Sequence, residues 1–307
     1  MFEPYETQIA LINLVQMKTV LIISSFVSAS HVGAGNSAFC LQRLGLETAI
    51  LPTTIFGRHP GWGPPGGTLT PPDLLSQIWE GIRAQGLMFD AVMTGYMGHP
   101  EHIALSCEII TYLKRQNPAL IVLVDPVMGD RTSKPGQLGA TGQLYVKEPV
   151  ARALIEDLLP LANITTPNLW ELEYITQETP TGLNAIYDIT KRKLPCESLV
   201  TSVPITGKTG NSEIGVMWNT SSESYYVSHE KFLSVPNGGG DALAGTFFAH
   251  RLNGVAGQTA LNAATSSIFE IMTAADLDDL GELPLIRKQD ALLYPPALTL
   301  WTAPYDC

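Results

Sequence analysis

The fold is constrained most by a regular alternation of short apolar runs with longer helical patterns. Residues 19–24 and 120–124 are apolar, rich in β-branched side chains and too short for helices. Such runs are typical of parallel strands that are buried on both faces. Segments such as 36–44 and 101–115 repeat apolar residues at helical spacing. The alternation continues to residue 203 and predicts one α/β domain with a largely parallel sheet.

The last third of the chain predicts a different local order. Residues 214–218 and 225–227 read as two antiparallel strands joined by a polar turn. Helices are expected over 241–252 and 258–272, and residues 274–307 predict a final helix at most. The sheet should therefore end in an antiparallel edge.

The acidic composition limits the possible partners. The net charge is −11 and the sequence has no basic block, so we expect neither a nucleic-acid nor an anionic-membrane partner. No apolar run reaches the length of a membrane span. Residues 1–16 contain two glutamates and no basic residue, which argues against a secretory signal. We interpret them as an extension that precedes a single domain of residues 17–307. Four scattered cysteines are typical of reduced thiols in a cytoplasmic protein.

Loops that follow the carboxyl ends of strands are the expected binding positions in such a fold. Ser25 follows the first strand and is a candidate ligand contact, or else a strand-end cap. Residues 52–72 are rich in Pro and Gly, and no regular element is predicted there. Within this segment, His59 and Trp62 suit stacking on a planar ring; the alternative is a surface loop without a ligand.

Carboxylates occur at two further strand ends. Asp125 ends the most apolar strand, and Asp130 follows nearby, which favours a metal or water contact over a simple cap. Residues 131–143 are either a flap over phosphates or a plain loop. Asn168 and Glu171 share the first turn of a predicted helix, where they form a capping box or reach a hydrated Mg²⁺.

The sequence Asn237-Gly-Gly-Gly-Asp241 precedes a helix of small apolar residues. Glycine N–H groups and a helix N-terminus together form an anion site. A carboxylate beside such a site repels phosphate, but it suits a base that takes a proton from an attacking hydroxyl. The alternative is an N-cap role for Asp241.

Several separate segments resemble the pyridoxal kinases of the ribokinase superfamily, most closely the bacterial pyridoxamine/pyridoxal kinase type. The resemblance covers about residues 18–295 and implies a three-layer α/β/α fold with a largely parallel central sheet and an antiparallel edge. The matching segments are 24–27, 31–33, 42–45, 51–54, 59–61, Thr-Gly-Tyr-Met-Gly at 94–98, Asp-Pro-Val-Met-Gly-Asp at 125–130, 144–146, Thr-Pro-Asn-Leu-Trp-Glu-Leu-Glu at 166–173, 200–202 and 238–241.

The resemblance implies a role for each matching position. Ser25 matches a serine on the pyridine side of the substrate, and Pro60 and Gly61, after His59, match a flap against it. Asp125 and Glu171 match an acidic pair near Mg²⁺ and the ATP phosphates. Nucleotide-side positions are Thr166, Thr201, Asn237, Gly238, Gly239 and Gly240, of which Gly238 and Gly240 form the anion hole.

The implied reaction is transfer of the γ-phosphoryl group of ATP to the 5′-hydroxymethyl group of pyridoxal, with Asp241 as base. The resemblance also implies a homodimer and allows K⁺ as a second cation. Gly239 stands where a side chain is usual, Ser30 stands where glycine is usual, and the segment 131–143 is longer than in relatives. Two alternatives therefore remain: a hydroxymethylpyrimidine kinase of the same fold, and a vitamin-B6-binding protein without catalysis.

Overall fold

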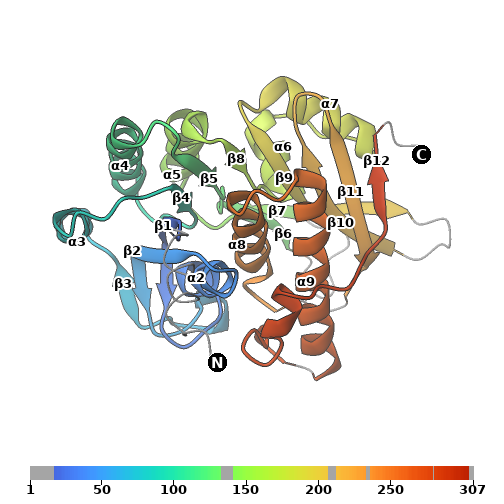
Figure 1. Ribbon diagram of the computed structural model, residues 1–307, viewed down its shortest axis with the longest axis horizontal. Helices are drawn as coiled ribbons and strands as arrows, with labels where there is room; N and C mark the ends of the chain where they lie inside the picture. The colour runs from blue at the N-terminus through green and yellow to red at the C-terminus, as the bar shows by residue number, and fades with distance from the viewer. Residues whose placement is uncertain (1–16, 133–140, 207–211, 233–235, 279, 304–307) are drawn as a thin grey trace, which may run out of the picture.

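The computed structural model describes residues 17–132, 141–206, 212–232, 236–278 and 280–303, and the expected extension 1–16 lies outside them (Figure 1). Ten strands form one sheet. Their bounds, in sheet order, are β12 (Leu300–Thr302), β11 (Ser224–Glu230), β10 (Ser212–Asn219), β9 (Glu197–Thr206), β8 (Ile164–Thr165), β5 (Ile121–Val124), β4 (Ala91–Thr94), β1 (Thr19–Val27), β2 (Glu47–Phe56) and β3 (Gly67–Leu69).

The middle of the sheet is parallel, and both edges are antiparallel. Strands β2, β1, β4, β5, β8 and β9 pair in parallel, whereas β3 and the series β10, β11 and β12 pair antiparallel. The largely parallel sheet with an antiparallel edge is therefore confirmed, and β3 adds a second antiparallel edge. The parallel arrangement brings the carboxyl ends of β1, β5, β8 and β9 to one side of the sheet.

Helices cover both faces of this sheet, as the three-layer prediction requires (Figure 1). Val20 and Ile22 of β1 face a core with α2, α8 and α9, whereas Leu21 and Ile23 face a core with the other helices. This alternation follows from the two-residue period of a strand. The helices are α2 (Gly33–Arg43), α3 (Pro72–Ala84), α4 (Pro100–Gln116), α5 (Glu148–Ala153), α6 (Leu169–Thr176), α7 (Leu183–Lys193), α8 (Gly239–Leu252) and α9 (Gly257–Leu277).

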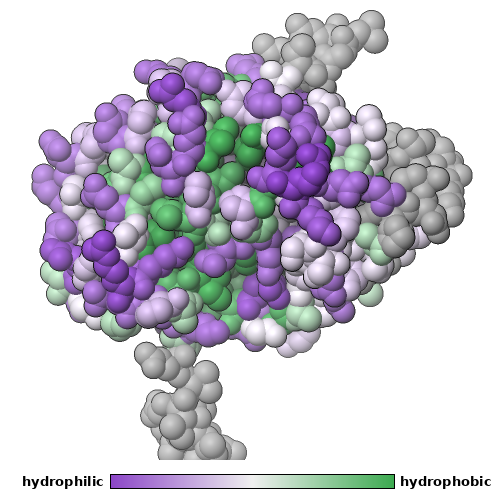
Figure 2. Space-filling model, turned by 90° about the horizontal axis from the view of Figure 1, so that it is seen from above, coloured by the Kyte–Doolittle hydropathy of each residue, from purple (hydrophilic) through white to green (hydrophobic). Residues whose placement is uncertain are grey.

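The layer with α4, α5 and α7 lies uppermost in Figure 1 and faces the viewer in Figure 2. Hydrophobic residues gather across the middle of this face, with hydrophilic residues around them (Figure 2). Among the described residues, no helix combines the length and apolar character needed to cross a bilayer.

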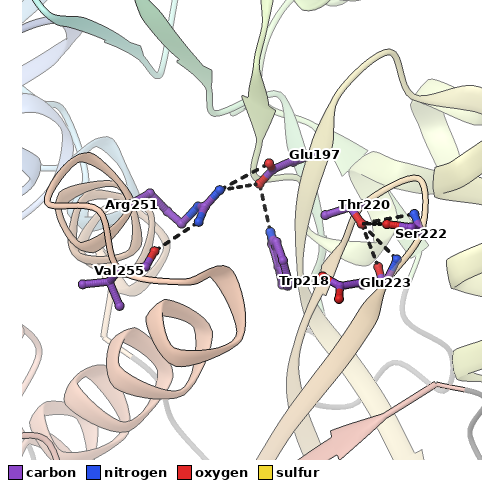
Figure 3. A network of polar contacts seen from close by, with 7 residues as sticks. All are labelled: Glu197, Trp218, Thr220, Ser222, Glu223, Arg251 and Val255. Carbon is purple, nitrogen blue, oxygen red and sulfur yellow. Dashed lines mark hydrogen bonds and ion pairs between the residues drawn. The ribbon is translucent and has the colours of Figure 1, made fainter.

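A polar network fixes the far end of α8 to the sheet (Figure 3). The Arg251 guanidinium lies 3.3 Å from both carboxylate oxygens of Glu197 and 5.7 Å from the centre of the Trp218 ring. Trp218 Nε1 donates to the same carboxylate at 3.1 Å. These contacts join the C-terminus of α8 to β9 and β10. The helix, which begins in the glycine loop (residues 237–240), is therefore held at its other end.

Some local expectations were wrong. The segment 52–72 is not free of regular structure, because β2 runs to Phe56 and then pairs with β3. The β-branched residues Thr53, Thr54 and Ile55 continue the strand beyond Pro52. Two short strands, β6 (Gly129–Thr132) and β7 (Thr141–Leu144), form a hairpin within the expected flap or loop; residues 133–140 lie outside the described residues. The C-terminal segment contributes β12 to the sheet.

Candidate active site

A cavity of about 590 Å³, here called the Ser25 cavity, opens where β1 and β2 end beside the glycine loop. All five predicted substrate-binding residues line it, although they come from three distant parts of the chain. They are Ser25, His59, Pro60, Gly61 and Asp241. Residues that the sequence did not single out as binding positions complete the walls: Val27, Val32, Gly33, Phe56, Tyr96, Val127, Gln143, Leu144 and Tyr145.

Two further cavities adjoin the same loop. The Asp125 cavity, of about 220 Å³, is lined by the predicted residues Asp125, Thr166, Glu171, Thr201, Gly238, Gly240 and Asp241. The Phe269 cavity, of about 380 Å³, is lined by Thr201, Asn237 and the three glycines, and by His229, Phe232, Phe269 and Met272. Gly238 lines all three cavities, and Asp241 lies between the Ser25 and Asp125 cavities. The structure thus brings every predicted site residue together, while the role of each stays a prediction.

The glycine loop depends on Gly238. This residue is the N-cap of α8 and has φ of 93°, in the left-handed region that favours glycine. A Cβ atom here would overlap the carbonyl oxygen of His31. Asn36, buried in α2, donates to the carbonyl oxygens of both His31 and Gly238, at 2.9 and 2.8 Å. The loop is therefore held in place by the neighbouring 31–36 segment.

Asp241 does not act as the N-cap of its helix. Among the described residues, no side chain caps the N-terminus of α8. Instead, Asp241 Oδ2 accepts a hydrogen bond from Gly33 N at 2.9 Å, across 208 residues of sequence. Burial raises the pKa of the Asp241 carboxyl to about 6, although the Gly33 N–H group opposes this rise. A carboxylate with a pKa near neutrality is suited to accept a proton at physiological pH.

Asp125, which is buried, adds a second acid to the same place. Burial and the charge of Asp241 together raise the pKa of its carboxyl to about 8, although the Thr166 hydroxyl opposes the rise. A carboxyl whose pKa is raised by burial and by the charge of a neighbouring carboxylate favours the binding of a cation, which offsets that charge. The Asp125 cavity is therefore suited to positive charge, despite its glycine N–H groups.

Glu171 takes part in a capping box, as one sequence interpretation predicted. Its Oε2 accepts from Asn168 N at 2.9 Å, and its Oε1 accepts from Met128 N and Gly129 N at 2.9 and 3.3 Å. Burial and the charge of Asp125 raise the pKa of Glu171, and these three N–H groups lower it. Backbone N–H groups donate to both oxygens of Glu171. This carboxylate is therefore suited to bind a cation through an intervening water molecule.

The donor set of the Asp125 cavity fits Mg²⁺. Across the described part of the chain, no three His, Cys, Asp or Glu residues form a ready-made metal cage. Mg²⁺ commonly binds through one or two carboxylates together with waters and substrate phosphates. The adjacent Asp125 and Glu171 supply such an incomplete set.

His59 links two loops around the Ser25 cavity. Its Nδ1 accepts from Gly61 N at 3.1 Å and lies 3.3 Å from Asn237 Nδ2. Burial lowers the pKa of His59, which favours the neutral ring that can accept these bonds. The Trp62 ring meets the His59 ring edge-on at 5.7 Å. Asn237 lines the Ser25 and Phe269 cavities, so it lies between the two.

An aromatic group in the Phe269 cavity was missed by the sequence reasoning. The His229 ring lies 4.8 Å from Phe269 and 5.6 Å from Phe232, measured between ring centres. The three rings come from β11, the segment after it, and α9, so no short motif joins them. A Cβ atom on Gly239 would meet the terminal methyl group of Met272, which lines the same cavity.

Comparisons with known proteins show the family of this chain. The family model described as phosphomethylpyrimidine kinase matches residues 66–279. Pyridoxal kinase PdxY of Corynebacterium diphtheriae is 30% identical over 285 residues, covering 90% of this chain and 96% of the relative. Pyridoxal kinase PdxY of Actinobacillus succinogenes is 30% identical over 297 residues, covering 91% and 96%.

Solved structures show the same fold. The crystal structure of pyridoxal kinase from Entamoeba histolytica has a TM-score of 0.81 at 21% identity and covers 94% of this chain and 100% of that one. Pyridoxal kinase from Leishmania donovani in complex with ADP and pyridoxamine has a TM-score of 0.80 at 21% identity, with the same coverage. The family model matches most of the chain, and the pyridoxal kinase relatives match nine-tenths of it. The chain therefore belongs to the pyridoxal kinases, within the phosphomethylpyrimidine kinase family.

Proposed function

We propose that this phosphotransferase transfers the γ-phosphoryl group of ATP to the 5′-hydroxymethyl group of pyridoxal, which yields pyridoxal 5′-phosphate for vitamin B6 salvage. The single observation that carries the proposal is the position of Asp241. This half-buried residue lines both the Ser25 cavity and the Asp125 cavity, at the first turn of α8. An alcohol in the first cavity and a phosphate in the second would meet beside this base.

Each wall of the site has a proposed task. The Ser25 cavity holds the pyridine ring, with Ser25 as a polar contact and the His59–Gly61 segment against the ring. The N–H groups of the glycine loop and the N-terminus of α8 stabilise negative charge on the transferred phosphoryl group. Asp241 accepts the hydroxyl proton as the oxygen attacks phosphorus in line. The rings of His229, Phe232 and Phe269 provide a surface for the nucleotide base.

Mg²⁺ is the cation assigned to the Asp125 cavity. Asp125 and Glu171 would hold it, the latter through water. When bound, Mg²⁺ supplies positive charge to the phosphate oxygens during transfer. Without it, Asp125 and Asp241 would oppose a triphosphate electrostatically, so we expect activity to be lost when the metal is chelated. A K⁺ requirement and a homodimer are parts of the proposal that rest on the family resemblance alone, and a cytoplasmic location rests on the scattered cysteines.

A panel of acceptors tests the proposal. Purified protein with ATP and Mg²⁺ is given pyridoxal, pyridoxine, pyridoxamine or a hydroxymethylpyrimidine, and the phosphorylated products are separated by chromatography. We expect the highest kcat/KM for a B6 vitamer. The hydroxymethylpyrimidine is the second candidate acceptor, favoured by the description of the matching family model. A clear preference for the pyrimidine would replace pyridoxal as the substrate.

A further inference from the structure

The hairpin of β6 and β7 contributes to all three cavities. Asp130 and Gln143 form one cross-strand pair; Asp130 lines the Asp125 and Phe269 cavities, and Gln143 lines the Ser25 cavity. Tyr145, directly after β7, lines both the Ser25 and Asp125 cavities. The position of this hairpin therefore sets the shape of the site on both sides of Asp241.

A two-stranded hairpin of this size is marginal on its own and needs packing to hold one position. The packing surface here is the indole ring of Trp170 in α6. Cβ atoms at Gly129 of β6 or Gly142 of β7 would overlap that ring, so both strands lie directly on it. Gly142 pairs with Arg131, two residues after Gly129, so the two glycines share one face of the hairpin.

Polar contacts from the same helix turn fix one end of the hairpin. Asn168 Nδ2 donates to the Gly129 carbonyl oxygen at 2.8 Å, and Glu171 accepts from the Gly129 N–H group. Arg131 pairs with Glu173. The Trp170 ring also stacks on Tyr174, with 5.3 Å between ring centres. The indole is thus held between α6 and the hairpin, and it has little freedom to follow if the hairpin moves.

We propose that Trp170 is a positioning residue for phosphoryl transfer: its ring holds the two glycines of the hairpin so that Asp130, Gln143 and Tyr145 keep their places along the cavities. The proposal rests on the proposed kinase function for its kinetic consequence. Trp170 does not itself line any of the three cavities, so it acts through the hairpin. Loss of the ring removes the surface beneath both strands and lets the walls of the site shift.

The test compares Trp170→Ala and Trp170→Phe with the wild-type protein. We expect Trp170→Ala to lower kcat/KM for both ATP and pyridoxal by roughly 10- to 100-fold, since small misplacements of site groups have effects of that size. Trp170→Phe keeps an aromatic surface and should recover most of the activity. Trp79→Leu is the control, because Trp79 is a buried tryptophan of α3 that lines none of the three cavities.

Amide hydrogen exchange of residues 141–144 provides a readout that does not depend on activity. We expect faster exchange there in Trp170→Ala than in the wild type or in Trp79→Leu. If the alanine variant does not fold, Trp170→Leu takes its place. The proposal is overturned if exchange of the hairpin is unchanged, or if the folded variant keeps wild-type kinetic constants. A wild-type protein without kinase activity would instead refute the proposed function, and the exchange comparison would still test the packing role.

Discussion

Replacement of Gly33 by alanine should damage the site more than the fold. Gly33 has φ of 61°, and a Cβ atom there would lie closer than 3.0 Å to both the carbonyl oxygen and the hydroxyl of Ser25. Its N–H group also holds the Asp241 carboxylate at 2.9 Å. One added methyl group therefore displaces a predicted substrate contact and the donor to the predicted base together.

The effect can be sized from these contacts. A left-handed backbone at a residue with a Cβ atom costs roughly 1–2 kcal/mol, and overpacking in a closed site costs about 1–3 kcal/mol more. The free energy of unfolding should fall by roughly 2–5 kcal/mol, or somewhat less because alanine also restricts the unfolded chain. We expect kcat/KM to fall by roughly 10²-fold, as for other small displacements of catalytic groups.

Gly45→Ala is the matched control. Gly45 also has a positive φ, of 85°, but a Cβ atom there would meet no atom within 4 Å. This variant should carry only the backbone cost of about 1–2 kcal/mol and keep wild-type activity. Thermal or denaturant unfolding gives the stabilities, and initial rates with pyridoxal and ATP give kcat/KM. The reasoning is refuted if folded Gly33→Ala is as active as Gly45→Ala.

Two further predictions concern charge and loop coupling. The kcat/KM for pyridoxal should fall as the pH drops through about 6, because the pKa of Asp241 is raised to about 6 and the base must be ionised. A plot of kcat/KM against pH that stays flat down to a pH of about 5 would contradict this role. His59→Ala and Asn237→Ala should each raise the KM for pyridoxal by roughly 2- to 10-fold, because each removes the same 3.3 Å contact. The KM of the double variant should be no higher than that of the more affected single variant. Fully additive effects on KM would show that the two residues act independently.

The parallel core of the fold could be predicted because its signals are local. Strand β1 is one apolar run whose alternate residues fill the two cores, and no distant residue is needed to recognise it. The glycine loop is equally local, since Gly238 to Asp241 are consecutive. Helix α7 was missed because its composition is polar, although its buried residues Leu183, Ile186 and Ile189 recur three positions apart.

The contacts that arrange the site could not be predicted from the sequence. The bond from Gly33 to Asp241 joins residues 208 positions apart, and nothing beside either residue indicates the partner. The packing of Trp170 on Gly129 and Gly142 similarly depends on how α6 lies against the hairpin. The capping box of Asn168 and Glu171 could be predicted from the sequence. The hydrogen bonds that the Met128 and Gly129 N–H groups donate to the same carboxylate could not.

The central claim, that Asp241 deprotonates an alcohol beside the terminal phosphate of ATP, is tested most directly by comparing product formation in the wild type and in Asp241→Asn. The wild type should form pyridoxal 5′-phosphate from pyridoxal and ATP. The variant should still bind pyridoxal in a calorimetric titration, while its kcat falls by roughly 10²-fold or more. Full activity in Asp241→Asn, or no product with the wild type, would contradict the account.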